Sequence, residues 1–107
     1  MTNLEQIKLP KEFIQVTDET YVSIWGNRHE RDGWYKVIHG RERVIQFFKI
    51  ENGDCHRLDG PAFIQVNYYG GLVIDAQFCV KNRYMQQEEY WKHPLVVEHT
   101  FKKIIEL

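Results

Sequence analysis

A short turn motif occurs twice in this chain and places the strongest limit on how it can fold. The motif His-x-x-Asp-Gly spans residues 29–33 and again residues 56–60. An apolar run follows each copy, over residues 34–38 in the first case and 61–66 in the second. An internal repeat of this length usually marks one supersecondary unit that is used more than once. The sequence therefore predicts a repeated architecture, and the repeat alone predicts no activity.

Length and composition limit the chain to one small domain without a strong charge. At 107 residues it suits a single domain over residues 1–107, with one modest core. The formal net charge is −1, so no overall field draws the chain to nucleic acid or to a membrane. The first residues are polar and lack the pattern of a secretory signal, and no apolar run is long enough to span a bilayer. We therefore expect a cytoplasmic protein, in which Cys55 and Cys79 stay as independent free thiols.

Runs of β-branched and aromatic residues predict a series of antiparallel strands. The expected strands cover residues 13–16, 21–25, 34–38, 44–50, 62–69 and 72–80. Asn52-Gly53 is a strong turn signal, and Gly70-Gly71 is predicted to form a two-residue hairpin loop. The alternation in the last two strands indicates that one face packs, with residues such as Ile64 and Ile74. The opposite face is mostly solvated and carries Gln65, Asn67, Asp75, Gln77 and Cys79.

Aromatic residues make up 14% of the chain, which is a high share for one small core. Phe47 and Phe48 are adjacent, so a strand points them to opposite faces. Tyr68 and Tyr69 are opposed in the same way. At least one residue of each pair is therefore expected to pack under a cover or to be exposed, and an exposed one is a candidate interface anchor.

The C-terminal part of the chain changes from strand to helix periodicity. Residues 86–92 are good helix formers, and Pro94 is expected to stop this helix and to start a second one. Val97, Phe101 and Ile104 share one helical stripe, and the helices are expected to cover one face of the sheet. The predicted fold class is α+β. It consists of an antiparallel β-meander built from repeated hairpins, with units over residues 26–52 and 53–82 and a short helical tail over residues 85–107.

The second turn motif carries a family resemblance. Residues 56–62 read His-Arg-Leu-Asp-Gly-Pro-Ala, which resembles the core of MORN-like repeats whose units read roughly NGxxHRxDGPAxIxY. Such repeats occur in small proteins of large tailed phages and other large DNA viruses. The resemblance covers residues 45–94 well and residues 25–44 loosely. The chain departs from the pattern at Trp34-Tyr35, where Pro-Ala is expected, and at Arg83, which replaces a glycine.

The two turns allow a structural and a chemical interpretation. In the structural one, Asp accepts from backbone N–H groups two residues on, Gly supplies the turn geometry, and His packs or bonds across the repeat. In the chemical one, the two turns converge on a metal ion. The ligands would then be His29, Asp32, His56 and Asp59. We favour the structural interpretation and expect neither a metal nor a cofactor. Cys55 and His56 are adjacent, which rarely lets two side chains aim at each other, so no catalytic pair is expected.

Alternate turns of a meander lie at the same end of the sheet, so residues 26–33, 51–60 and 81–84 are expected to share one edge. This predicted arginine edge is a candidate surface for a partner. Its expected contact residues are Arg28, Arg31, Arg57 and Arg83, with Trp34 or Tyr69 as aromatic anchors. Acidic neighbours such as Asp54 weaken an RNA-binding interpretation, because phosphate binding needs a net positive surface.

The resemblance and the absence of a catalytic motif favour a non-enzymatic function. The resemblance implies a phage-type accessory protein that binds and modulates a host macromolecule in the bacterial cytoplasm. We expect this partner to be a protein, such as a defence or toxin component. Two alternatives stay open: RNA binding by the same arginine edge, and a metal-binding or enzymatic protein that uses the two turns. The oligomeric state also stays open, since a meander has two unpaired edges.

Overall fold

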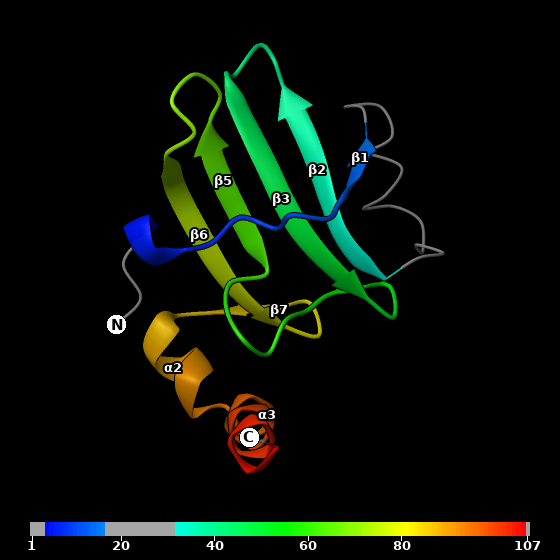
Figure 1. Ribbon diagram of the computed structural model, residues 1–107, viewed down its shortest axis with the longest axis vertical. Coiled ribbons are helices and arrows are strands. Elements are labelled where there is room, and N and C mark those ends of the chain that lie inside the picture. The colour runs from blue at the N-terminus through cyan, green and yellow to red at the C-terminus, as the bar shows by residue number, and fades with distance from the viewer. Residues whose placement is uncertain (1–3, 17–31, 107) are drawn as a thin grey trace.

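The computed structural model describes residues 4–16 and 32–106, and it confirms the predicted α+β fold (Figure 1). The expected strand over residues 21–25 and most of the first turn motif lie outside the described residues. The elements are the 3₁₀ turn η1 (Leu4–Gln6), the strands β1 (Ile14–Val16), β2 (Gly33–His39), β3 (Val44–Glu51), β4 (Asp54–Cys55), β5 (Phe63–Asn67), β6 (Val73–Val80) and β7 (Arg83–Met85), and the helices α2 (Gln87–Lys92) and α3 (Pro94–Ile105).

The strands form one sheet in the order β1-β2-β3-β5-β6-β7, and β4 pairs with β3 beside this path. All of these pairs are antiparallel except β1 with β2, which run parallel. Strands β2 to β6 follow one another as a meander. The chain from η1 to β1 instead crosses one face of the sheet before β1 joins the edge of β2 (Figure 1).

The two predicted turns have different outcomes. Asn52 and Gly53 have φ angles of 53° and 83° and join β3 to β4, which confirms the tight turn. The prediction of a two-residue loop at Gly70-Gly71 is wrong, because β5 ends at Asn67 and β6 begins only at Val73. The side-chain oxygen of Asn67 accepts hydrogen bonds from the backbone N–H groups of Tyr69 and Gly70. This Asx turn captures donors that a longer hairpin would have used and so ends the ladder early.

In β2 and β3 both faces of the sheet carry core. In β5 and β6 the predicted solvated face is confirmed at Asn67, Asp75 and Gln77, which are exposed, and is wrong at Cys79, which is buried. Phe48 is fully buried and its ring stacks on Tyr35 at 5.5 Å. Phe47 points to the other face and is also buried, with the ring of Phe13 edge-on at 5.7 Å. Ile7 packs against the same side as Phe47. Residues 7–13 therefore act as a strap that covers this face (Figure 1).

Burial in β6 changes along the strand and not only from face to face. Cys79 was expected on the wet face but is fully buried, whereas Ile74 was expected to pack and is 46% exposed. The C-terminal half of β6 lies between the second turn motif and α2, and Phe78 and Val80 are buried there against Tyr90. In the N-terminal half, the pairing of β5 with β6 shifts register between Gln65 and Val66, so Val73 pairs with Val66 and packs on the core in place of Ile74.

The two helices form where the sequence predicts them. Pro94 is the first residue of α3, and the Nδ1 atom of His93 accepts from the N–H of Leu95 as the N-cap. The helices do not cover a face of the sheet as expected. They lie at its end (Figure 1), where Tyr90 and Val96 pack against Phe78. Only Gln86 separates β7 from α2, so the chain has no length with which to return over the sheet.

Candidate partner-binding surfaces

Arg57 holds the second turn motif together from inside. Its Nε atom donates to Asp59 Oδ1 at 2.7 Å, and its Nη1 atom donates to the carbonyl oxygen of Pro61 at 2.9 Å. The guanidinium also lies over the ring of Trp34, 5.1 Å from its centroid. The Arg57 side chain is only 19% exposed. Burial would raise the pKa of Asp59, but the hydrogen bond and charge of Arg57 outweigh it and hold that pKa below its usual value.

The glycine of the motif leaves room for this arginine to pack closely. A Cβ atom on Gly60 would lie 2.9 Å from the Cζ atom of Arg57 and 3.1 Å from its two Nη atoms. The guanidinium of Arg57 would have to move away from Asp59 and Pro61 to make room, and the φ angle of 157° at Gly60 is one that residues with a side chain rarely adopt. His-Arg-x-Asp-Gly is therefore a packing motif, in which the arginine folds back over the glycine and onto the aspartate.

Tyr90 of α2 ties this turn to the helical tail. The tyrosine is fully buried, and its hydroxyl accepts from the N–H of Gly60 at 3.2 Å. The same hydroxyl donates to the carbonyl oxygen of Arg57 at 2.6 Å and lies 2.9 Å from that of Gly60. Burial raises the pKa of Tyr90 to about 12, so the hydroxyl keeps its proton and stays a donor near neutral pH.

The predicted bond across the repeat is present at His56. This buried side chain accepts from the backbone N–H of Lys81 through Nδ1 at 2.9 Å. Asn82 adds to the junction, because its side chain donates to Asp54 and accepts from the N–H of Cys55, each at 2.7 Å. The turns at 51–60 and 81–84 therefore do share one edge, as expected.

The aspartates of the two motifs do not bond as predicted. The Oδ1 atom of Asp32 accepts from the N–H of Asn52 at 2.9 Å, which belongs to the next turn and not to the residue two positions on. Asp59 accepts from Arg57, and its Oδ2 atom lies 3.5 Å from the Nζ atom of Lys103 in α3. A charged donor within reach outcompetes the local N–H groups at Asp59. Each aspartate thus joins its turn to a neighbour.

The environment of His56 predicts a stability that depends on pH. Burial is the main cause that lowers the pKa of His56 below its usual value of 6.5. The unfolded chain therefore binds more protons than the folded chain in slightly acidic solution. We expect stability to be complete above about pH 6.5 and to fall as the pH drops from there toward the folded-state pKa.

Thermal melts between about pH 7.5 and pH 5 measure this effect. The variant His56→Asn retains a side-chain acceptor for the N–H of Lys81 but does not titrate. Its profile is expected to be flatter than that of the wild type. An equally steep profile in the variant would assign the pH dependence to other groups.

The two cysteines lie together in the core beside the second turn motif. Cys55 and Cys79 are free thiols, as expected, and both are fully buried, but they contact each other and are not independent. Their contact raises the pKa of Cys79, through a hydrogen bond to Cys55 and through burial. Within residues 4–16 and 32–106, no group of three or more His, Cys, Asp or Glu side chains is placed to hold a metal ion. His29, one of the four proposed ligands, lies outside these residues.

The six expected contact residues do not gather on one surface. Arg28 and Arg31 lie outside the described residues. Arg57 and Trp34 contact each other, and Arg83 pairs with Glu89 at 3.1 Å while its side chain stays 72% exposed.

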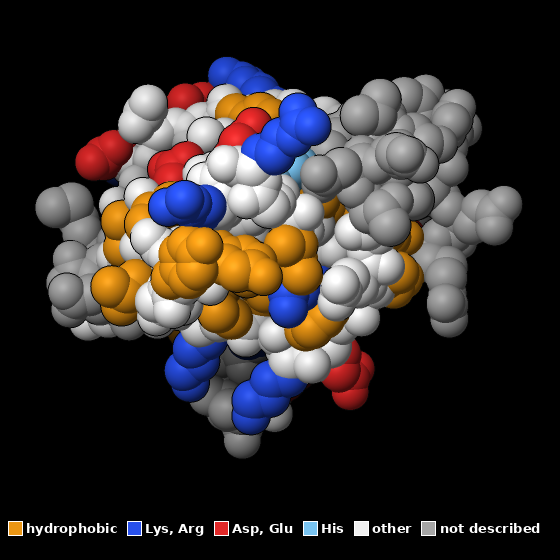
Figure 2. All heavy atoms as spheres, turned by 90° about the horizontal axis from the view of Figure 1, so that it is seen from above, with side chains coloured by type: hydrophobic (Ala, Val, Ile, Leu, Met, Phe, Trp, Pro, Cys, Tyr) orange, Lys and Arg blue, Asp and Glu red, His pale blue; other side chains and the backbone are white. Residues whose placement is uncertain are grey.

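Tyr69 lies in the loop between β5 and β6, at the opposite end of the sheet from Arg57 (Figure 1). It is 74% exposed, with the guanidinium of Arg43 5.7 Å from its ring. Leu72 in the same loop is 70% exposed. Figure 2 looks onto this end of the molecule and shows hydrophobic side chains in its middle, with Lys and Arg side chains around them. Tyr69 therefore belongs to a surface of its own.

The sequence indicated one further surface but assigned it to the core. Phe101 and Ile104 are each 62% exposed, and Val97 and Ile105 are also exposed. We call these four residues the α3 stripe. Helix α3 instead buries Val96, one position away, against the end of the sheet. The spacing predicted the stripe correctly, but it carries no information about which face of a short helix its neighbours cover.

A groove of about 600 Å³ borders the α3 stripe. Its walls are Asp59 of the turn motif, Trp91 of α2, and residues of α3 that include His99, Lys103 and Ile104. The Nε2 atom of His99 is buried and has no hydrogen-bond partner. A buried polar atom without a partner is costly unless a ligand or water satisfies it.

This chain matches no protein-family model, no curated protein and no solved structure. The resemblance to MORN-like phage repeats is therefore carried by the motif residues alone. Among the described residues, no helix is long and apolar enough to cross a membrane.

Proposed function

We propose that this protein is a small non-enzymatic binding protein and that its partner is another protein. The observation that carries the proposal is the exposed α3 stripe. Four large apolar side chains on one face of a 12-residue helix stand in solvent, and a contiguous apolar patch of this kind commonly marks a protein interaction site. An amphipathic helix with exposed residues at spacings of three and four is a frequent docking element.

The chemistry of the turn motifs supports a binding role more than catalysis. The polar side chains of the second motif form hydrogen bonds within the folded chain, as the contacts of Arg57, Asp59 and His56 show. Arg57 and Arg83 are both paired with carboxylates, which leaves less positive charge for phosphate groups and disfavours RNA. The resemblance to phage repeats adds the proposal that the partner is a host protein in the bacterial cytoplasm.

A double variant in the α3 stripe tests the proposal. Phe101→Lys combined with Ile104→Lys places positive charge on the apolar face, near the helix C-terminus where positive charge favours the helix. A partner is first captured from bacterial lysate with the wild-type protein and identified by mass spectrometry. Its affinity is then measured for both forms, and we expect the double variant to bind about tenfold or more weakly.

Two control variants locate the site. Leu72→Lys changes an apolar residue of similar exposure at the other end of the molecule, and it is expected to bind as the wild type does. Arg28→Glu combined with Arg31→Glu tests the predicted arginine edge. Arg57 is left out, because its charge reversal would disturb the turn. If the α3 variant folds with an unchanged melt and keeps full affinity, the α3 stripe is not the site.

A further inference from the structure

Strand β6 has a free edge along more than half of its length. It pairs with β5 from Val73 to Gln77, but it pairs with β7 only from Phe78 to Val80. Over residues 73–77, β6 therefore has a hydrogen-bonded strand on one side only, within the part of the chain that the structure describes. An unpaired edge presents backbone N–H and C=O groups that another strand can use.

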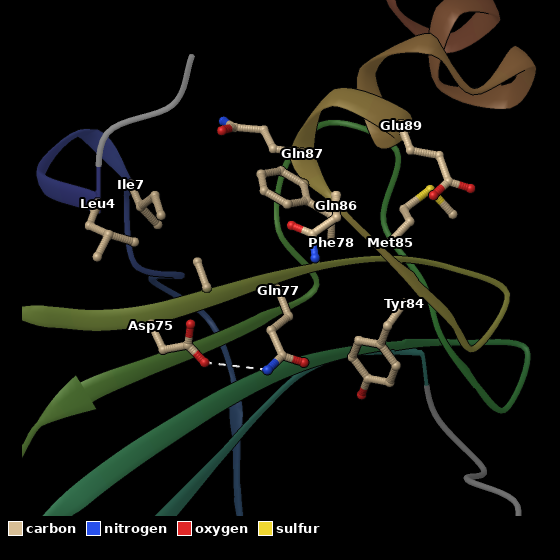
Figure 3. Close-up of a pocket in the computed structure, with 11 residues that line it drawn as sticks. Leu4, Ile7, Asp75, Gln77, Phe78, Tyr84, Met85, Gln86, Gln87 and Glu89 are labelled. Carbon is tan, nitrogen blue, oxygen red and sulfur yellow. Dashed lines mark hydrogen bonds between the residues drawn. The ribbon is translucent and has the colours of Figure 1, made fainter.

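This free edge lines a groove. A cavity of about 580 Å³ follows β6 from Asp75 to Phe78, between η1 on one side and the chain from β7 into α2 on the other. The two faces of the edge differ in chemistry. Figure 3 shows Leu4, Ile7 and Phe78 on one side of the β6 ribbon, with Asp75, Gln77 and Tyr84 on the other. The first side is apolar near Leu4, Ile7 and Phe78 and carries the amide of Gln87 farther along, whereas the side of Asp75 and Gln77 is polar.

Two polar groups in the groove point to a ligand. The Nε2 atom of Gln87 is buried and has no hydrogen-bond partner, and this side chain lines the cavity. The carboxylate of Asp75 accepts a hydrogen bond from Gln77 at 3.3 Å. No cation pairs with Asp75 among the described residues. The groove therefore offers one unsatisfied donor and one unneutralised negative charge.

We propose that the groove beside residues 73–77 of β6 binds an extended segment of a partner protein, which adds to the sheet as a further strand. Successive side chains of a strand point to opposite faces. The bound segment therefore alternates between apolar residues, which face Leu4 and Phe78, and basic residues, which face Asp75. Backbone hydrogen bonds supply affinity and the alternation supplies specificity, as in other cases of strand addition. The inference rests on the proposed binding function, but its site is separate from the α3 stripe.

Peptide binding tests the proposal without knowledge of the natural partner. The probe is a fluorescein-labelled peptide of about seven residues in which lysine and valine alternate, long enough to follow the free edge. Its control has the same sequence with every backbone nitrogen methylated, which removes the strand donors on both edges and keeps charge and side chains. Fluorescence anisotropy at low salt is expected to show at least about tenfold weaker binding of the methylated peptide. Equal binding of the two peptides would overturn strand addition.

Variants and hydrogen exchange locate the peptide. Asp75→Asn is expected to weaken binding about threefold or more, whereas Glu42→Gln, an exposed carboxylate in the turn between β2 and β3, is expected to leave it unchanged. Amide exchange at residues 73–77 should slow when the peptide binds.

Other outcomes overturn the proposal and are separable from failure of the proposed function. Protection of α3 in place of β6 would move the peptide to the α3 stripe. A protein that is dimeric without peptide and already protected at residues 73–77 would show that a second copy occupies the edge. If the peptide does not bind at all, the β6 groove is not a binding site. The test of the α3 stripe with the captured partner would be unaffected by that result.

Discussion

The variant Tyr90→Ala is expected to lower the free energy of unfolding by about 3–5 kcal/mol. The ring is fully buried and packs on Phe78, with the ring centroids 4.6 Å apart. Its loss leaves a cavity between the helical tail and β6, and it removes the hydroxyl that holds Arg57 and Gly60 of the turn motif. Urea unfolding followed by circular dichroism measures the change.

Tyr90→Phe separates the hydroxyl from the ring. This variant keeps the packing but leaves the N–H of Gly60 and the carbonyl of Arg57 without their partner, which is expected to cost about 1–3 kcal/mol. The matched control is Tyr69→Phe, the same change at a residue that is 74% exposed, with an expected effect within about 0.5 kcal/mol. Equal effects at the two positions would show that the Tyr90 hydroxyl does not stabilise the turn.

Phe48→Ala is expected to be equally damaging, at about 3–5 kcal/mol. The side chain is fully buried at the centre of the sheet and stacks on Tyr35 with 7° between the ring planes. The cavity left in β3 would be lined by Val37 and Ile50, whose positions are fixed by strand pairing. Denaturant unfolding provides the measurement.

Two comparisons sharpen the Phe48 experiment. Phe101→Ala makes the same change in the exposed α3 stripe and is expected to alter stability by about 0.5 kcal/mol or less. Phe47→Ala removes the neighbouring ring on the opposite face and is also expected to be strongly destabilising, because the strap of residues 7–13 buries it. A small effect at Phe47 would contradict a core on both faces.

The sequence predicts the elements well because their signals are local. Asn52 and Gly53 adopt the left-handed conformations that their residue types allow, and Pro94 begins a helix where its fixed φ and missing N–H are tolerated. The meander follows from short connections between neighbouring strands. The strap was missed because residues 7–13 show no period of their own, and their role depends on an apolar face that forms far along the chain.

The candidate sites were harder to predict, since exposure depends on tertiary packing. Arg57 was expected at a partner surface, and no residue pattern reveals that its guanidinium folds back onto Asp59, Pro61 and Trp34. The α3 stripe was recognised as apolar but placed in the core, because periodicity does not tell which side of a helix finds a neighbour. The free edge of β6 is visible only once β7 is known to pair with three of its residues.

The strap has a consequence for the order of events during synthesis. Residues 7–13 leave the ribosome before the residues they cover, because Phe47, Ile64 and Val66 are all added much later. The hairpins from β2 to β6 join neighbours in sequence and close short loops, whereas docking of the strap closes a loop of more than 30 residues on Phe47. The strap is therefore made before the strands that it covers, and it can dock only after β3 and β5 have formed the face that it covers.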